Sequence, residues 1–272
     1  MNAKEVARIV EPVEAQMRRQ WWELMPESFA KKYRPLVAQL GGSLITLLQG
    51  STSKSMNVIL NLGVTEEARE SMIDEILSLA KAHAVKRFSF HLSPSDHSDK
   101  IEEWLLRRNF KLHSYYSKHF RQTNGHAKIV TDLVIKQINK EYATSYARVI
   151  CKNFGWPESR LPWVAATVGE PKFNHYMAFD GNLPVATGVL YIEGRCGYLA
   201  WGATMSTHRR RGAQAALIAE RVRRATQLGL KCVTAETFGP APGRPAISYR
   251  NFIRNGFEEV YRRPVFVWEQ TR

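Results

Sequence analysis

The stretch "THRRRGAQAAL" at residues 207–217 sets three arginines against one glycine and then continues into residues that favour a helix. It follows an apolar run, so it predicts a tight turn from a strand into a helix. Such a turn leaves main-chain N–H groups without partners at the positive end of the helix dipole. Gly212 has no side chain and would let a phosphate approach the backbone. The stretch therefore predicts either an anion site or a solvated helix start with surface arginines.

Composition places the chain among ordinary globular proteins. It has 272 residues, of which 44% are hydrophobic and 24% charged, which suits one large domain or two modest ones. No apolar run approaches the roughly 20 residues of a membrane span, and no apolar signal core follows the N-terminus. We therefore expect a cytoplasmic protein without a membrane partner. Three widely spaced cysteines indicate reduced thiols and predict no metal site.

The net charge of +14 favours anionic partners through long-range attraction. A nucleic acid, a phosphate-bearing cofactor and an acidic substrate all fit this charge, as does a basic surface that binds nothing. The sequence shows no RNA-recognition motif and no alternation of aromatic and basic residues, so a nucleic-acid partner is unlikely.

The elements around the turn can be read from hydrophobic periodicity and turn residues. The turn opens a helix at 212–229 whose Arg221 and Arg224 are predicted to face solvent. The C-terminal half predicts strands at 131–139, within 173–205, at 230–239 and at 257–270, and helical segments at 141–155, 156–169, 212–229 and 246–256. The N-terminal half predicts helices at 3–33, 66–84 and 98–109, and strands at 43–50, 55–64, 86–94 and 110–122.

The two halves repeat one pattern. "LLRRNFKLHSYYSKHF" at 105–120 and "FIRNGFEEVYRRPVFV" at 252–267 both read as a helix end, a turn, a phenylalanine and a strand. This similarity predicts a diverged duplication with domains at 1–124 and 128–272. The matching helix start in the first half carries Glu66 and Glu67, which satisfy the helix dipole and repel phosphate. Only the C-terminal half is therefore expected to bind an anion.

The order of strand, arginine–glycine turn, helix, buried strand, helix and strand resembles the GCN5-related N-acetyltransferase superfamily. The acyl-CoA motif of that family, Gln/Arg-x-x-Gly-x-Gly/Ala, stands here as residues 209–214. Gln214 departs from its sixth position, and an outward-pointing glutamine would leave room for the diphosphate. The resemblance implies an α/β (α+β) fold of two tandem domains, each a mixed, mostly antiparallel sheet flanked by helices. It covers 128–272 at full strength and 40–122 as a degenerate copy.

The same resemblance implies that acetyl-CoA is bound as acyl donor, with no metal. The end of a strand would bind the pantetheine arm through its backbone, the turn would bind the diphosphate, and a later helix would add polar contacts. The implied cofactor-binding residues are Gly202, Ala203, Thr204, Arg209, Arg210, Arg211, Gly212, Ala213, Gln214, Ala215, Ser248 and Asn251.

The implied activity is N-acetyl transfer, in which a primary amine attacks the thioester directly in a ternary complex. The amine must first lose a proton, because an alkylammonium with a pKa near ~10 has no lone pair. Glu236 is the candidate base; the alternative is a carboxylate that only pairs with Arg244 or Arg250. The family's tyrosine acid is replaced by Phe252. Tyr249 or Ser248, about one helical turn away, is the candidate acid, and the alternative is that the thiol leaves without a side-chain acid.

Phe252 also leaves a second hypothesis open, a non-catalytic protein that binds acyl-CoA or regulates by doing so. The acceptor amine is not identified by the sequence. The chain is expected to be a monomer or a homodimer.

Overall fold

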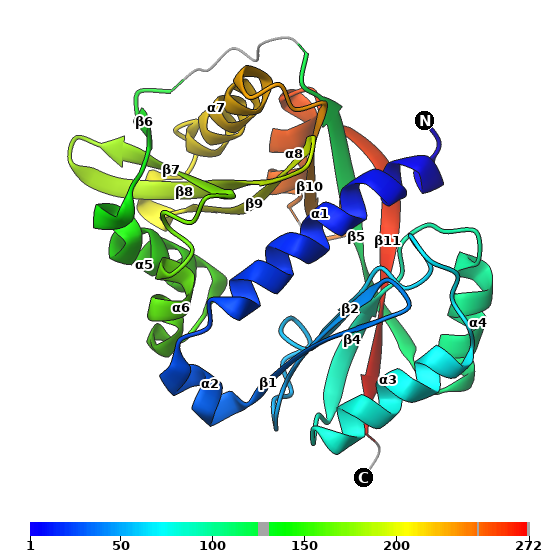
Figure 1. Ribbon diagram of the computed structural model, residues 1–272. Coiled ribbons are helices and arrows are strands. Elements are labelled where there is room, and N and C mark those ends of the chain that lie inside the picture. The colour runs from blue at the N-terminus through cyan, green and yellow to red at the C-terminus, as the bar shows by residue number, and fades with distance from the viewer. Residues whose placement is uncertain (125–130, 244, 271–272) are drawn as a thin grey trace. The chain divides into compact units, whose positions relative to one another are not determined.

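The computed structural model describes residues 1–124, 131–243 and 245–270 of the chain (Figure 1). Its contacts divide the chain into two compact units. Unit 1 comprises Met1–Tyr116 and Val260–Arg272, and unit 2 comprises Ser117–Glu259. Strands β5 (Lys111–Gln122) and β11 (Glu258–Glu269) each supply residues to both units. These bounds differ from those of the predicted domains, 1–124 and 128–272. The predicted domains describe a duplication within the sequence and remain a proposal.

Unit 1 is a mixed sheet in the order β1-β2-β3-β4-β11, with one parallel pair, β3 and β4. A capping box between Asn2 and Glu5 starts its first helix, as the spacing of these residues favours. Its further elements are α1 (Ala3–Glu23), α2 (Glu27–Tyr33), β1 (Pro35–Leu40), β2 (Ser43–Leu48), β3 (Val58–Leu60), α3 (Ser71–Ala82), β4 (Arg87–His91) and α4 (Ser98–Arg107).

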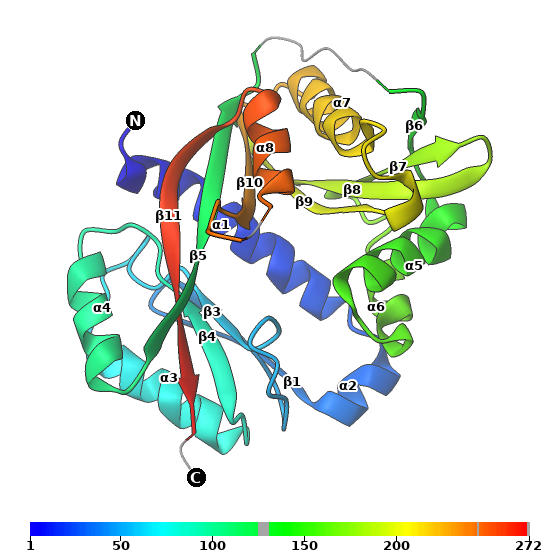
Figure 2. The ribbon, with the colours of Figure 1, turned by 180° about the vertical axis from the view of Figure 1, so that it is seen from behind.

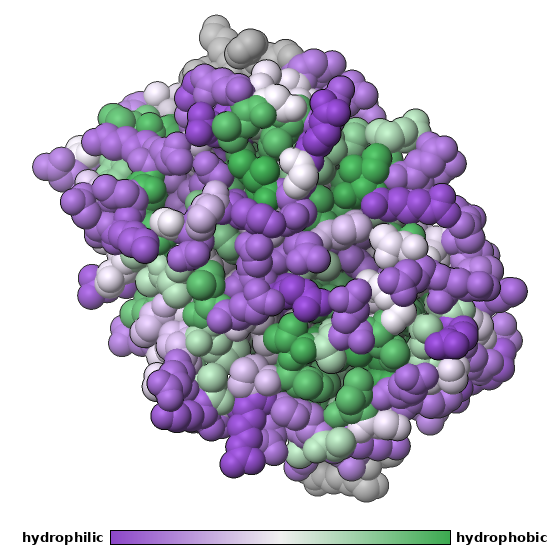
Figure 3. Space-filling view, in the orientation of Figure 1, coloured by the Kyte–Doolittle hydropathy of each residue, from purple (hydrophilic) through white to green (hydrophobic). Residues whose placement is uncertain are grey.

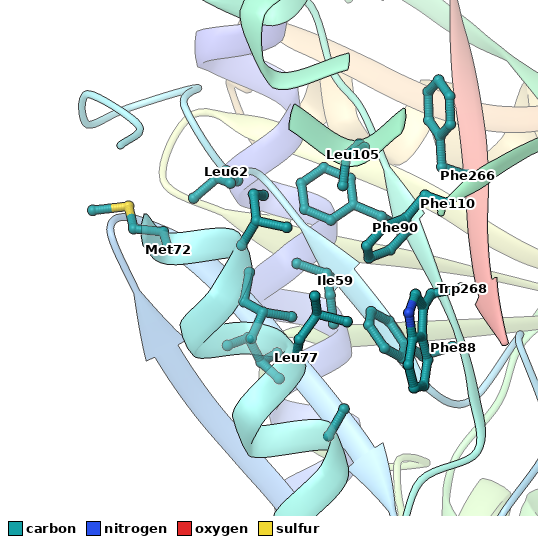
Figure 4. Close-up of a cluster of buried hydrophobic side chains, with 14 of the residues drawn as sticks. Ile59, Leu62, Met72, Leu77, Phe88, Phe90, Leu105, Phe110, Phe266 and Trp268 are labelled. Carbon is teal, nitrogen blue, oxygen red and sulfur yellow. The ribbon is translucent and has the colours of Figure 1, made fainter. Parts of the chain in front are cut away.

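Helices cover both faces of the unit 1 sheet, because its strands alternate buried apolar residues toward each side. Ile45 and Ile59 pack with residues of α3 and α4 in one core. Figure 4 shows Ile59 and Phe88 in this core. Leu44, the neighbour of Ile45, faces α1, where it packs with Ala15. Among the described residues, none of the helices has the length and apolar character needed to cross a bilayer.

Unit 2 has the strand order β5-β10-β9-β8-β7-β6, and its helices α5 and α6 lie on the opposite face from α7 and α8 (Figures 1 and 2). Its helices are α5 (Ala143–Phe154), α6 (Leu161–Ala165), α7 (Ala213–Gln227) and α8 (Ile247–Arg254), with short 3-10 turns at Lys140–Tyr142, Glu158–Arg160 and Ser206–His208. Its further strands are β6 (Val134–Gln137), β7 (Phe173–Asp180), β8 (Leu183–Glu193), β9 (Cys196–Thr204) and β10 (Cys232–Phe238).

The fold class agrees with the prediction, a mixed α/β fold with a mostly antiparallel sheet flanked by helices. Three local predictions are wrong. The helix expected from residue 66 begins at Ser71, and strand β1 was not predicted. Arg221, predicted to face solvent, is 1% exposed, because it turns from α7 onto the sheet.

Polar side chains cover most of the face in Figure 3, with apolar areas between them.

Candidate acyl-CoA site

The arginine–glycine turn adopts a backbone that only some residues tolerate. Arg210 and Gly212 both have left-handed φ angles, 65° and 78°, and the helix α7 begins directly after them. No side chain caps this helix start. Within the described part of the chain, no group accepts a hydrogen bond from the main-chain N–H of Gly212, Ala213 or Gln214. The turn thus presents donors at the positive end of a 15-residue helix, as an anion site requires.

The three arginines of the turn differ in their surroundings. Arg209 and Arg210 are exposed. Arg211 is held by two carboxylates, with its Nη1 2.6 Å from Asp180 Oδ2 and its Nε 3.1 Å from Asp132 Oδ2. Hydrogen bonds from Arg211 lower the pKa of both carboxyl groups. The side chain of Arg211 therefore anchors the turn, and the two exposed arginines are the ones available to an anion.

Strand β9 contains an extra residue opposite β8, a β-bulge. Thr187 pairs with Ala203 and Val189 with Ala200, so two steps along β8 match three along β9. Trp201 lies in the bulge and has a left-handed φ of 50°. Bulges bend a strand and re-aim its end. Here the redirected end is Gly202–Thr204, the segment predicted to bind pantetheine.

Gln214 points toward β9 rather than outward. Its Nε2 donates to Ala203 O at 2.8 Å, to Thr204 Oγ1 at 3.1 Å and to Thr187 O at 3.2 Å. A Cβ on Gly202 would lie 2.6 Å from Gln214 Oε1, so glycine leaves space for the glutamine. The expectation that Gln214 points away is wrong, because the carbonyl groups of the bulge attract its amide. The departure from the motif thus has a structural role.

Strands β9 and β10 are paired over part of their length only. Their parallel ladder joins Cys196–Leu199 to Cys232–Ala235, while β9 runs on to Thr204 and β10 to Phe238. Glu236 is the first residue of β10 beyond this ladder. Main-chain groups released where two strands stop pairing are available to a ligand. The divergence begins beside the candidate base.

Glu236 belongs to a buried ion pair. Its Oε2 lies 3.7 Å from Nζ of Lys118, and these side chains are 10% and 0% exposed. Lys118 also lies over the ring of Tyr198, 5.6 Å from its centroid. A lysine of β5 is therefore one partner of Glu236. Of the two arginines suggested from the sequence, Arg250 is exposed on α8 and Arg244 lies outside the described residues.

Tyr249 contacts a buried histidine from the same strand, β5. The ring centroids of His119 and Tyr249 are 5.1 Å apart, and His119 stacks on Phe252 at 5.3 Å. The Nε2 of His119 lies 2.8 Å from Thr237 Oγ1. Burial lowers the pKa of His119 to about 4, so the ring is neutral near pH 7. Thr237 follows Glu236 on β10, and neighbours on a strand point to opposite faces. His119 contacts both Thr237 and Tyr249, so Tyr249 lies on the other side of β10 from Glu236.

The side chains of the remaining predicted residues lie outside these contacts. Ser248 is exposed on α8 and Asn251 is half-buried there, while Ala213 packs in the core beneath α7 and Ala215 is half-buried. Lys118 and His119 were missed, because they lie in the half of the sequence expected to be inactive. Their only sequence signal is a lysine–histidine pair inside a strand pattern. Among the described residues no group of three His, Cys, Asp or Glu side chains could hold a metal ion.

Comparison with known proteins identifies the fold through structure alone. No protein-family model matches the sequence, and no curated protein matches it. A GCN5-related N-acetyltransferase from Kribbella flavida is 13% identical and matches with a TM-score of 0.63, covering 95% of this chain and 96% of the other. One from Sphaerobacter thermophilus gives 0.61 at 10% identity, over 84% and 80%. A tandem protein of this fold from the clavulanic acid pathway gives 0.60 at 12%, over 87% and 82%.

Proposed function

We propose that this chain, which has the tandem fold of the GCN5-related N-acetyltransferases, transfers an acyl group from acetyl-CoA to a primary amine. The observation that carries the proposal is the uncapped start of α7 at Gly212, next to a bulged β9 that separates from β10. The turn would bind the diphosphate through its N–H groups, with Arg209 and Arg210 adding charge. The end of β9 would bind the pantetheine arm.

The reaction needs a proton acceptor and a stable leaving group. The amine nitrogen attacks the thioester carbon and the C–S bond breaks. The attacking nitrogen then loses its second proton to water to give the neutral amide, and the coenzyme A thiolate takes up a proton. Glu236, at the point where β10 leaves the ladder, would accept the proton of the ammonium. Lys118 would pair with the Glu236 carboxylate and hold it at this point of β10. The thiolate would take its proton from water, because Tyr249 lies on the other side of β10 from Glu236.

Binding is tested by calorimetric titration with acetyl-CoA. Gly212→Glu places a carboxylate in the turn and is expected to abolish binding. Gly194→Glu is the matched control, because Gly194 also has a left-handed φ, 54°, with nothing near its Cβ position, and lies in the turn that precedes β9. Equal affinity of wild type and Gly212→Glu, or no binding by wild type, would contradict the proposal.

Transfer is tested by release of free coenzyme A with a panel of primary amines. Glu236→Gln is expected to slow release by about 100-fold or more and to leave the affinity for acetyl-CoA unchanged, as removal of a general base does. A rate unaffected by this substitution would exclude Glu236 as the base.

A second candidate function is acyl-CoA binding without transfer. Phe252 favours it: the position of the family's acid is occupied by a buried ring that stacks on His119. In that case acetyl-CoA binds, and no amine of the panel is acylated by the wild type.

A further inference from the structure

Arg221 is a buried cation on the helix that would bind the cofactor. Its guanidinium donates from Nη1 to Val189 O at 3.1 Å and to Ala200 O at 3.2 Å, and from Nε to Leu217 O at 2.9 Å. In the described part of the chain it has no carboxylate partner. Gly188 makes room for it, since a Cβ there would lie 2.6 Å from Arg221 Cζ. The side chain is thus built into the sheet.

Burying a charged side chain is unfavourable unless hydrogen bonds or an opposite charge compensate it. Desolvation lowers the pKa of Arg221 to about 10, which shows that its surroundings disfavour the charged form. Neutral carbonyl groups compensate a buried charge less well than a carboxylate does. A methionine of similar length would fill the same space without this penalty. Packing alone therefore does not account for an arginine at this position, and its hydrogen bonds to carbonyl groups distinguish it from methionine.

Those carbonyl groups lie at the bulge. Val189 and Ala200 form the pair on one side of the extra residue, and Arg221 donates to both. Thr187 and Ala203 form the pair on its other side, and Gln214 donates to both. Gln214 and Arg221 are seven residues apart, two turns of α7, and so share one face of the helix. Together they bracket the bulge.

We propose that Arg221 and Gln214 are positioning residues that hold β9 in its bulged form and so fix Gly202–Thr204 for the pantetheine arm of acyl-CoA. This inference rests on the proposed function. In this proposal Arg221 and Gln214 align β9, and the arginine–glycine turn binds the diphosphate. Loss of either residue then affects one part of the ligand and spares the other.

The test compares two ligands by calorimetry: acetyl-CoA, and the nucleotide fragment of coenzyme A that keeps the diphosphate but lacks pantetheine. Arg221→Met and Gln214→Leu keep side-chain size and remove only side-chain donors, so the main-chain N–H of residue 214 stays in place in the turn. Each is expected to weaken acetyl-CoA binding about tenfold, the effect of one or two lost backbone contacts, and to leave fragment binding unchanged. Arg221→Lys, which keeps a donor, is expected to recover part of the affinity.

Arg223→Met is the control, because Arg223 lies on the same helix but pairs at the surface with Glu220. Equal weakening of both ligands would indicate general damage to α7 and overturn the inference, as would unchanged acetyl-CoA binding. If Arg221→Met does not fold, Gln214→Leu decides by the same comparison. A wild-type protein that binds neither ligand contradicts the proposed function and this inference with it; normal wild-type binding with unaffected variants contradicts the inference alone.

Discussion

Replacing Gly202 with alanine is expected to destabilise unit 2 by displacing Gln214. The new Cβ would lie 2.6 Å from Gln214 Oε1, closer than such atoms approach, and the flexible glutamine would move. Its two amide hydrogens are shared among Ala203 O, Thr204 Oγ1 and Thr187 O. A net hydrogen bond contributes about 0.5–1.5 kcal/mol, so loss of both donors should lower the free energy of unfolding by about 1–3 kcal/mol.

Urea unfolding followed by circular dichroism measures this change. The control is Gly202→Ala in a Gln214→Ala background, where there is no amide to displace and the substitution should have little effect. The difference between the backgrounds is the coupling energy, for which about 1–3 kcal/mol is expected for residues in contact. If alanine at position 202 lowers the free energy equally in both backgrounds, the reasoning from this contact is wrong.

Three further predictions concern titration and exposure. Burial lowers the pKa of His119 from 6.5 to about 4, so the stability due to the neutral ring is complete above pH 6.5 and is lost as the pH falls toward 4; His119→Gln should flatten urea midpoints over that range. Arg211 lowers the pKa of Asp132 and Asp180, so its contribution is present above the ordinary carboxyl pKa of 3.8 and is lost in more acid solution; Arg211→Gln should remove this part of the pH dependence of the melting temperature. The three cysteines are buried, so a thiol reagent should modify them only after denaturation, and rapid labelling of the native protein would contradict the packing.

The sequence could predict the turn into α7, because that signal is local. Consecutive residues at 209–214 combine a positive-φ glycine with a helix start, and no distant contact is needed to form them. The fold class was implied by the family resemblance, which rests on the order of such segments. Glu236 could also be predicted as a candidate site residue from the sequence, because a carboxylate within an apolar strand is unusual whatever its partner.

The partners of these residues could not be predicted, because they depend on which strands become neighbours. Lys118 reaches Glu236, and His119 reaches Tyr249, only when β5 lies beside β10, and each partner is more than a hundred residues further along the chain. Arg221 was assigned to solvent because periodicity places charges outside. The carbonyl groups that accept its hydrogen bonds come from a bulge, and the sequence pattern did not indicate one.

Strands β5 and β11 are each divided between the two units, which limits where the chain can be cut into separate fragments. A cut between residues 124 and 128 leaves the C-terminal fragment without Lys118 and His119, and the N-terminal fragment without the strand that contains Phe266 and Trp268. Each product would expose an unsatisfied sheet edge, which favours aggregation. The two fragments would have to fold together to restore what neither holds alone.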